Sequence, residues 1–179
     1  MNTFQLLLWD DEGSACTFYT TSWDIDEEDI NSETDKFFNQ FADPGHSFHD
    51  HSNQLARLIT ASIGEKYGAI DDFFDRSENL AQALPPKPKY HVVEIMDMGL
   101  NFPLRLYCYR VSRNIVILFN GGIKDVVTVQ DSPSLKAKFS EAQIFVKKIQ
   151  DALQSGLITI SVDGRYIENK NGSKEIILY

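Results

Sequence analysis

The chain of 179 residues has a hydrophobic content of 42%, an aromatic content of 12% and a formal net charge of −9 at pH 7. These values are typical of a globular protein with its own core, and they exclude a disordered or fibrous chain. No apolar stretch approaches the length of about 18 residues that a transmembrane helix needs, so we expect no membrane span.

The first part of the chain predicts one strand and two helices. Residues 16–23 (CTFYTTSW) are rich in β-branched and aromatic side chains and favour a strand. A helix is expected over 32–42, because Ser32 followed by Asp35 resembles a capping box. A second helix over 46–64 follows from apolar side chains at helical spacing, namely Leu55, Leu58, Ile59 and Ile63.

The stretch ALPPKPK at 83–89 marks a break, because its three prolines cannot continue a helix. After it the pattern changes to strands, and we predict an antiparallel meander of 90–96, 103–111 and 115–120, with 16–23 in the same sheet. The unbroken apolar run at 115–120 predicts a central strand that is buried on both faces, with Ile117 in the core.

Residues 134–153 predict a long helix with one apolar face, and the remaining residues predict a β-tail of short strands separated by DG and NGS turns. The expected fold class is α+β. A mainly antiparallel sheet carries two N-terminal helices and one C-terminal helix over one face. We expect one domain over 1–155 and a β-hairpin-like C-terminal appendage over 156–179.

The cysteines and histidines predict no metal centre and no cofactor. Cys16 and Cys108 lie in apolar, strand-like contexts, and we interpret them as reduced, buried thiols of a cytoplasmic protein. His46, His49 and His51 are close along the chain, but zinc needs three or four convergent ligands. A polar start of a surface helix is the simpler interpretation of the three histidines.

Basic and aromatic side chains gather in the stretch 104–124. Because side chains alternate along a strand, Arg105, Tyr107 and Tyr109 share one face, which we expect to be accessible to solvent. A packed, half-exposed sheet surface is the alternative interpretation. The pair Gly121-Gly122 predicts a bend or bulge, with a phosphate-binding loop as the alternative. The short turn SRN at 112–114 makes the next strand antiparallel, so Lys124 at its far end is expected close to Arg105.

These residue types suit the cleavage of RNA without a metal ion. Such cleavage requires an activated 2′-hydroxyl, a neutralised phosphate and a protonated leaving oxygen. Guanidinium and ammonium groups neutralise phosphate, and tyrosine stacks on a base or passes a proton. For the RNA cleavage that the family resemblance described below implies, the candidate catalytic residues are Arg105, Tyr107, Tyr109 and Lys124. The candidate RNA- and phosphate-binding residues are Arg110, Arg113, Lys136 and Lys138.

The distribution of charge bears on this function. Residues 1–80 hold 17 acidic and 4 basic side chains, whereas residues 81–179 hold 9 acidic and 13 basic ones. An acidic chain is a poor general nucleic-acid binder, because contacts to phosphate supply most of the affinity. A basic surface confined to residues 81–179 would still suit RNA or an acidic partner, while an uneven but solvated set of charges is the alternative.

Three motifs and the element order resemble a known family. The motifs are RLY at 105–107, the apolar strand at 115–119 and the loop GGIK at 121–124. With the order of strand, two helices, three strands and a helix, they resemble the RelE/ParE superfamily of bacterial toxins, most closely its phage-derived HigB-like branch. The similarity extends over roughly residues 16–153.

The resemblance implies the toxin component of a type II toxin–antitoxin system, neutralised by a helix-turn-helix-type antitoxin protein. Many members of the family cleave mRNA on the ribosome, others poison gyrase, and some have no established activity. The second hypothesis is a non-catalytic protein-interaction module on the same fold, which binds a partner through its acidic half or its β-tail.

Overall fold

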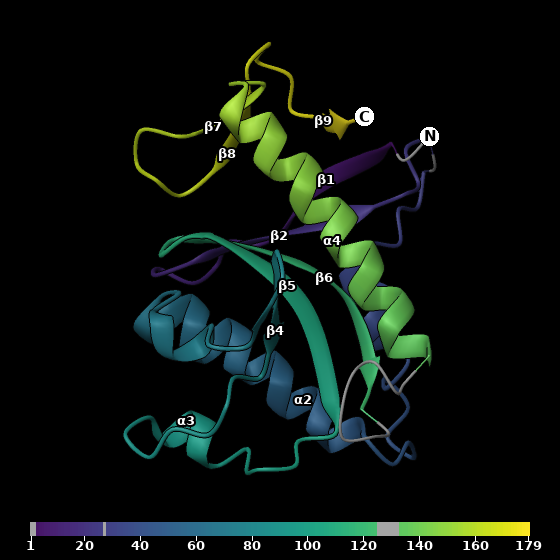
Figure 1. Ribbon diagram of the computed structural model, residues 1–179, viewed down its shortest axis with the longest axis vertical. Coiled ribbons are helices and arrows are strands. Elements are labelled where there is room, and N and C mark those ends of the chain that lie inside the picture. The colour runs from purple at the N-terminus through teal and green to yellow at the C-terminus, as the bar shows by residue number, and fades with distance from the viewer. Residues whose placement is uncertain (1–2, 27, 125–132) are drawn as a thin grey trace.

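Helices pack on both faces of one large sheet in the computed structural model of the chain, which describes residues 3–26, 28–124 and 133–179 (Figure 1). The strands of this sheet are β1 (Phe4–Asp10), β2 (Thr17–Ser22), β3 (Ser77–Glu78), β4 (Ala81–Leu84), β5 (Leu104–Ser112), β6 (Ile115–Ile123) and β9 (Ile176–Leu178). Within the described residues the sheet has seven strands in the order β3-β4-β5-β6-β2-β1-β9. A separate two-stranded sheet is formed by β7 (Ile158–Ile160) and β8 (Ile167–Asn169). The predicted α+β class is confirmed.

The helices are α1 (Glu33–Asn39), α2 (His49–Arg57), the π-helix η1 (Leu58–Tyr67), the 3-10 helix η2 (Asp71–Phe73), α3 (Val93–Met96) and α4 (Pro133–Gln154). The helix predicted over 32–42 is α1, and the Ser32 hydroxyl accepts a hydrogen bond from the Asp35 backbone N–H at 3.1 Å, as the capping motif indicates. The helix predicted over 46–64 is formed by α2 and η1 in succession, and that over 134–153 is α4. Among the described residues, no helix has the length and apolar character needed to cross a membrane.

The strand β6 is central and buried on both faces, as its apolar run predicted. Val116 and Leu118 belong to a core cluster shared with α1, α2 and η1, and Ile115, Ile117 and Phe119 belong to a second cluster beneath α4. Since alternate side chains of a strand point to opposite faces, helices cover both faces of the sheet. The prediction of helices over one face is wrong, because a strand that is apolar on both faces needs cover on both.

The sheet is mixed, because β2 runs parallel to β6, with Thr17 opposite Ile115 and Thr20 opposite Leu118. The chain between these two strands passes through α1, α2, η1 and β3 to β5, and so long a crossover permits a parallel pair. The pairs β1–β2, β4–β5 and β5–β6 are antiparallel, as is the pair β1–β9. The sequence therefore predicted the β5–β6 hairpin correctly but not the direction of β2.

Residues 90–96 are not a strand, and this prediction is wrong. They contain the short helix α3, and the strand that pairs with β5 is β4. Val92 and Ile95 are buried, whereas Val93 and Met96 are exposed. The valines favour a strand by composition, but burial at a spacing of three residues follows the helical period and not the alternation of a strand.

The two ends of the chain meet at one edge of the sheet, where β9 pairs with β1 from Phe4 opposite Leu178 to Leu6 opposite Ile176 (Figure 1). Ile176 and Leu178 are buried in the core cluster beneath α4. The tail over 156–179 thus supplies one strand of the main sheet as well as the β7–β8 hairpin. The division of the chain at residue 155 stays a prediction.

The cysteines are buried free thiols, as predicted. Burial raises the pKa of the Cys16 thiol to about 12, and burial also raises the pKa of the Cys108 thiol. Both thiols are therefore protonated at neutral pH and serve as small apolar side chains of the core.

Gly121 lies at a bulge in the β5–β6 ladder, where Leu106 pairs with Gly121 and Cys108 pairs with Leu118. This confirms the predicted bend or bulge. A Cβ added at Gly121 would lie 1.9 Å from the Arg105 carbonyl oxygen, whereas one at Gly122 would meet Leu135 at an ordinary 3.7 Å.

We therefore expect Gly121→Ala to lower the free energy of unfolding by about 1–3 kcal/mol, because the two strands must separate to admit the methyl group. Gly122→Ala, the matched control, should change it by less than about 0.5 kcal/mol. Urea denaturation of both variants measures the difference, and equal losses would contradict the close approach at Gly121.

Candidate functional site

The face of β5 that carries the predicted catalytic residues is covered by α4. Tyr107 and Tyr109 lie on the side of the second core cluster, opposite Leu104, Leu106 and Cys108, so the predicted alternation is confirmed. Arg105 and Tyr107 are only 4% and 1% exposed, so the prediction that they are solvent-accessible is wrong. The Tyr107 ring packs edge-on against Phe139 of α4, with ring centroids 5.6 Å apart. The period of a strand shows which residues share a face, but not whether a helix covers it.

The Arg105 guanidinium is held by its own strand end. Its Nη1 atom donates to the carbonyl oxygens of Phe102 at 2.9 Å and Leu104 at 2.8 Å. The backbone N–H of Lys124 donates to the Pro103 carbonyl at 2.7 Å, and Leu104 pairs with Ile123. The backbones of Arg105 and Lys124 are therefore close, as the antiparallel hairpin predicted, while the Arg105 side chain is buried and not on a surface.

Two predicted RNA-binding residues, Arg110 and Arg113, do line one hollow. This hollow has a volume of about 490 Å³ and lies between the loop 69–71 and residues 110–113, which are the end of β5 and the first residue of the β5–β6 turn. We call it the arginine hollow. Arg110 reaches across it, and its Nη1 atom donates to Asp71 Oδ1 at 2.7 Å and to the Ala69 carbonyl at 3.1 Å.

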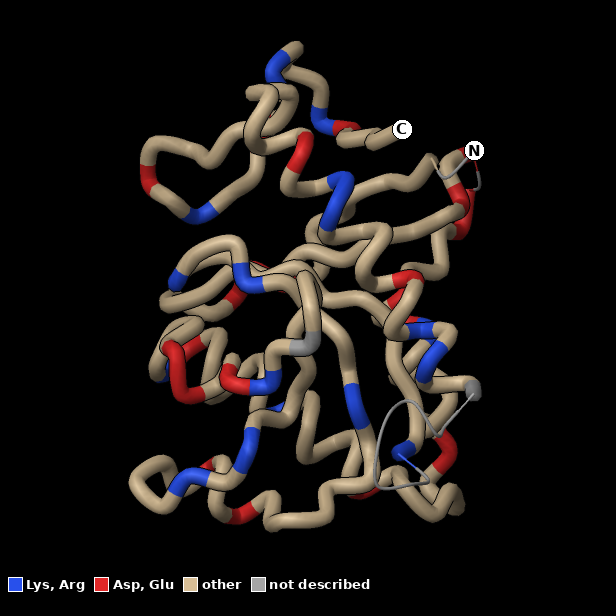
Figure 2. Tube along the Cα trace, in the orientation of Figure 1, with Lys and Arg blue, Asp and Glu red and all other residues tan. Residues whose placement is uncertain are grey.

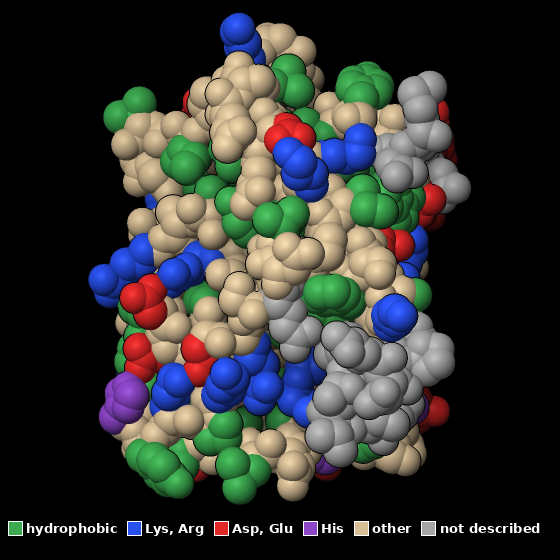
Figure 3. Space-filling view, viewed as in Figure 1, with side chains coloured by type: hydrophobic (Ala, Val, Ile, Leu, Met, Phe, Trp, Pro, Cys, Tyr) green, Lys and Arg blue, Asp and Glu red, His purple; other side chains and the backbone are tan. Residues whose placement is uncertain are grey.

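Arg113 is the more available cation of the arginine hollow. It is exposed, and its Nη2 atom donates to the Tyr67 carbonyl at 3.5 Å. In the part of the chain that the structure describes, Arg113 forms no ion pair, whereas Arg110 pairs with Asp71. Figure 3 shows Lys and Arg side chains at the left edge of the molecule, beside the β5–β6 turn, with acidic side chains next to them. A guanidinium in such a place can pair with a phosphate through two parallel hydrogen bonds.

The two walls of the arginine hollow are joined to each other through the backbone. The Ala69 N–H donates to the Arg113 carbonyl at 2.8 Å. Gly68, which ends η1, has φ of +75° and lies so close to the Arg113 and Ala15 carbonyls that a Cβ would be 3.3 and 3.5 Å from their oxygens. A positive φ favours glycine, so this residue allows the chain to leave η1 and run beside the turn.

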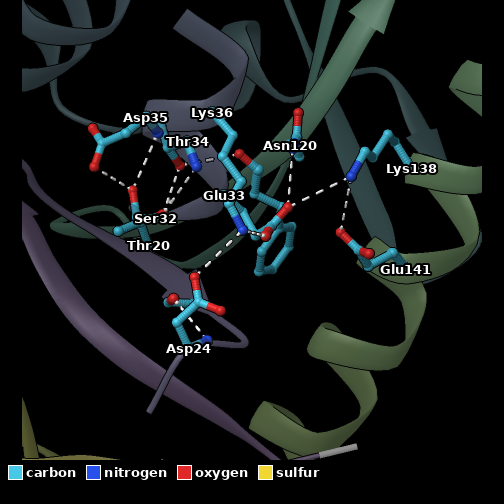
Figure 4. A network of polar contacts seen from close by, with 12 residues as sticks. Thr20, Asp24, Ser32, Glu33, Thr34, Asp35, Lys36, Asn120, Lys138 and Glu141 are labelled. Carbon is cyan, nitrogen blue, oxygen red and sulfur yellow. Dashed lines mark hydrogen bonds and ion pairs between the residues drawn. The ribbon is translucent and has the colours of Figure 1, made fainter. Parts of the chain in front are cut away.

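The other two predicted RNA-binding residues lie on α4. Lys136 is exposed, and Lys138 Nζ lies 3.6 Å from both Glu33 Oε2 and Glu141 Oε1. Figure 4 shows Lys138 between these two carboxylates, where the polar network spans α1, β6 and α4. Neither lysine lines the arginine hollow.

Glu33 is the centre of that network and is only 2% exposed. Its carboxylate accepts hydrogen bonds from Asn120 Nδ2 and Lys36 Nζ, both at 2.9 Å (Figure 4). Burial raises the pKa of the Glu33 carboxyl, but these hydrogen bonds and the charges of Lys36 and Lys138 outweigh burial and leave the pKa lowered. Burial and the charge of Glu33 raise the pKa of Glu141. The network ties α1 to β6 and α4, and we assign it to stability.

The fold brings acidic residues of the first part of the chain beside basic residues of the second. Ion pairs join Asp71 to Arg110 at 2.7 Å and Glu33 to Lys138 at 3.6 Å, and another joins Asp75 to Lys89. Figure 2 shows basic and acidic positions interleaved over the folded chain and not separated into two halves. An acidic chain can therefore place cations around a central strand: a carboxylate of another element pairs with Arg110, and backbone carbonyls accept hydrogen bonds from Arg105 and Arg113.

His46 and His49 are engaged in local hydrogen bonds. The Phe48 N–H donates to His46 Nδ1 at 3.0 Å, and His49 Nδ1 is 2.7 Å from the Phe41 carbonyl oxygen. The described residues contain no group of three or more His, Cys, Asp or Glu side chains that could hold a metal ion.

Sequence reasoning missed the carboxylates that accompany the predicted cations. Asp71 and Arg110 are 39 positions apart, and Glu33 and Asn120 are 87 apart. No local pattern signals such pairs; Glu33 stands out in the sequence only as the residue after the Ser32 cap. Comparison of the chain with protein-family models, with curated proteins and with solved structures found no match.

Proposed function

We infer that this chain binds RNA through the arginine hollow, as the toxin-like component of a toxin–antitoxin pair. The observation that carries this inference is that Arg110 and Arg113 line one open hollow of about 490 Å³. This volume lies within the range of small-molecule sites and admits a phosphate with part of its nucleotide. Arg113 supplies an exposed guanidinium for the phosphate, and single-stranded RNA exposes such groups.

The toxin-like part of the proposal rests on the resemblance of residues 104–124 to the RelE/ParE superfamily. Of the elements behind that resemblance, the chain has β5, the bulged β6 and the long α4 in succession, whereas residues 90–96 contain helix α3 in place of a strand and β2 runs parallel to β6. A helix-turn-helix-type antitoxin protein is the partner that this proposal implies, and mRNA on the ribosome is the target. The geometry favours RNA binding over cleavage, because Arg105 and Tyr107, two of the four predicted catalytic residues, are buried.

Fluorescence anisotropy with a short single-stranded RNA tests the binding. Arg113→Ala should weaken the affinity about tenfold and reduce the salt dependence by about one counterion, measured between about 50 and 200 mM salt. Lys147→Ala is the matched control, because Lys147 is also an exposed cation but pairs with Asp151 on α4. Equal losses in the two variants, or no binding by the wild-type chain, would contradict an RNA site at the arginine hollow.

A second candidate function, a protein-interaction module, is favoured by exposed apolar side chains around α3. Tyr90, Val93, Met96 and Leu100 are 90%, 59%, 45% and 77% exposed within eleven residues of chain. Several exposed apolar residues close together indicate a contact surface more than isolated ones do. If this is the main function, Tyr90→Ser with Leu100→Ser should abolish complex formation with the antitoxin in size-exclusion chromatography, and Arg113→Ala should leave it intact.

A further inference from the structure

Arg165 joins the C-terminal hairpin to the loop that precedes β2. Arg165 lies just before β8, and its Nη2 atom donates to the Gly13 carbonyl at 2.7 Å and its Nε atom donates to Thr17 Oγ1 at 3.1 Å. Its Nη1 atom donates to the Ser14 carbonyl. A single guanidinium therefore binds three residues of one short segment, the loop 13–16 with the first residue of β2, Thr17, and we call this segment 13–17 the bridging loop.

The bridging loop in turn holds the β5–β6 turn that carries Arg113. The Thr17 N–H donates to the Asn114 carbonyl at 2.8 Å, and Asn114 Nδ2 donates to the Ala15 carbonyl at 3.2 Å. Asn114 is the residue next to Arg113. Two hydrogen bonds thus fix the turn against the bridging loop, to which Arg165 is also hydrogen-bonded.

The bridging loop also fixes the opposite wall of the arginine hollow. The N–H groups of Ala15 and Cys16 both donate to the Gly64 carbonyl of η1, at 2.9 and 3.0 Å. Gly13 packs so closely on this helix that an added Cβ would lie 2.3 Å from the Gly64 carbonyl oxygen. The end of η1 leads through Gly68 into the loop 69–71, so both walls depend on one loop.

We propose that Arg165 is a positioning residue for the arginine hollow, so that the C-terminal hairpin forms part of the RNA-binding site without touching the RNA. This proposal rests on the function inferred above. In Figure 1 the loop between β7 and β8 extends on the same side of the molecule as the β5–β6 turn. Supporting side chains of this kind determine how well a binding group is held in its productive geometry.

The hairpin has an attachment of its own, which allows Arg165 to be changed without detaching it. The Ile167 N–H donates to the Tyr19 hydroxyl at 2.9 Å, and Ile158 and Ile167 are buried in the core cluster beneath α4. Arg165→Gln should therefore loosen the bridging loop while the hairpin stays in place. Tyr166→Phe is the matched control, because the Tyr166 hydroxyl donates to Asp11 Oδ2 at 3.0 Å, outside the bridging loop.

Amide hydrogen exchange tests the positioning without any ligand. In Arg165→Gln the N–H groups of Thr17 and Ala69, which bond to Asn114 and Arg113, should exchange about tenfold faster than in the wild type. In Tyr166→Phe they should exchange at the wild-type rate. Unchanged exchange in Arg165→Gln, or equal acceleration in both variants, would overturn the proposal.

A double-mutant cycle with RNA then separates positioning from the loss of a positive charge. Arg165→Gln should weaken RNA binding about fivefold in the wild-type background and have no further effect in an Arg113→Ala background, because it acts through Arg113. Equal losses in both backgrounds would mean a general charge effect and would overturn the positioning role. If the wild-type chain binds no RNA while exchange is accelerated in Arg165→Gln, the proposed function fails and the positioning of the turn stands.

Discussion

Replacing Glu33 with alanine is expected to lower the free energy of unfolding by about 3 kcal/mol at neutral pH. The substitution leaves Asn120 Nδ2 and Lys36 Nζ without the carboxylate that both now contact at 2.9 Å. This value is at the lower end for a buried ion pair, because the side chains of Lys36 and Lys138 keep 35% and 34% of their surface exposed. Urea denaturation at neutral pH measures the loss. A loss below about 1 kcal/mol would show that the network does not contribute substantially to the stability of the fold.

The same network predicts opposite dependences on pH for its two carboxyl groups. A group whose pKa is lowered on folding stabilises the fold above its unfolded pKa and loses this contribution as the pH falls through its folded pKa. The pKa of Glu33 is lowered from 4.5, so the difference between wild type and Glu33→Gln should be full at neutral pH and shrink as the pH falls below 4.5.

Glu141 is the control, because the change in stability expected from its ionisation has the opposite sign to that of Glu33. Its pKa is raised from 4.5, so its ionisation destabilises the fold as the pH rises above this value. Glu141→Gln should therefore raise the melting temperature at neutral pH, and the gain should vanish in acid. Changes of the same sign in Glu33→Gln and Glu141→Gln would contradict the assignment of the charges in the network.

Ile117→Ala is expected to cost about 2–5 kcal/mol of stability. Ile117 is fully buried in β6, the fourth of seven strands in the sheet described, and it packs in the cluster beneath α4. The substitution removes three carbon atoms from a site that helices and strands close on both sides. Denaturant unfolding measures the cost.

Leu100→Ala is the matched control for this core substitution. Leu100 is 77% exposed, so the loss of its side chain should change the stability by less than about 0.5 kcal/mol. A cost at Ile117 below about 1 kcal/mol, or a cost equal to that at Leu100, would mean that β6 does not form the centre of the core.

Most elements of the fold were predictable because their signals are local. The Ser32 cap, the helical spacing of apolar residues in α2, η1 and α4, and the β5–β6 hairpin all depend on residues close together in the sequence. The same holds for the bulge at Gly121. The prediction of a strand over 90–96 was wrong because its valines favour a strand, whereas its buried residues follow the spacing of a helix. The helix α3 has only four residues, which is too short for that spacing to be recognised in the sequence.

The site was predictable in its residue types more than in its geometry. Arg110 and Arg113 line the hollow because Arg110 lies near the end of β5 and Arg113 in the turn that follows, and the sequence already indicated this hairpin. Arg105 and Tyr107 were expected on an open face, yet both are buried, and α4 packs on Tyr107 through Phe139. Whether a helix packs on a given face depends on contacts between segments far apart in the chain. The spacing of residues within one strand or helix gives no information about such contacts.

The sequence by itself determined the class of the fold, the central apolar strand and the set of cations around it, because these follow from composition, capping and alternation. Only the tertiary structure decided which cations face solvent, which carboxylates lie beside them, and that β2 joins β6 in parallel. It also decided that Arg165 of the tail reaches the bridging loop, 148 to 152 positions earlier in the chain. These features depend on contacts that form when distant segments pack together, and the free energy of packing is a property of the whole fold and not of any one stretch.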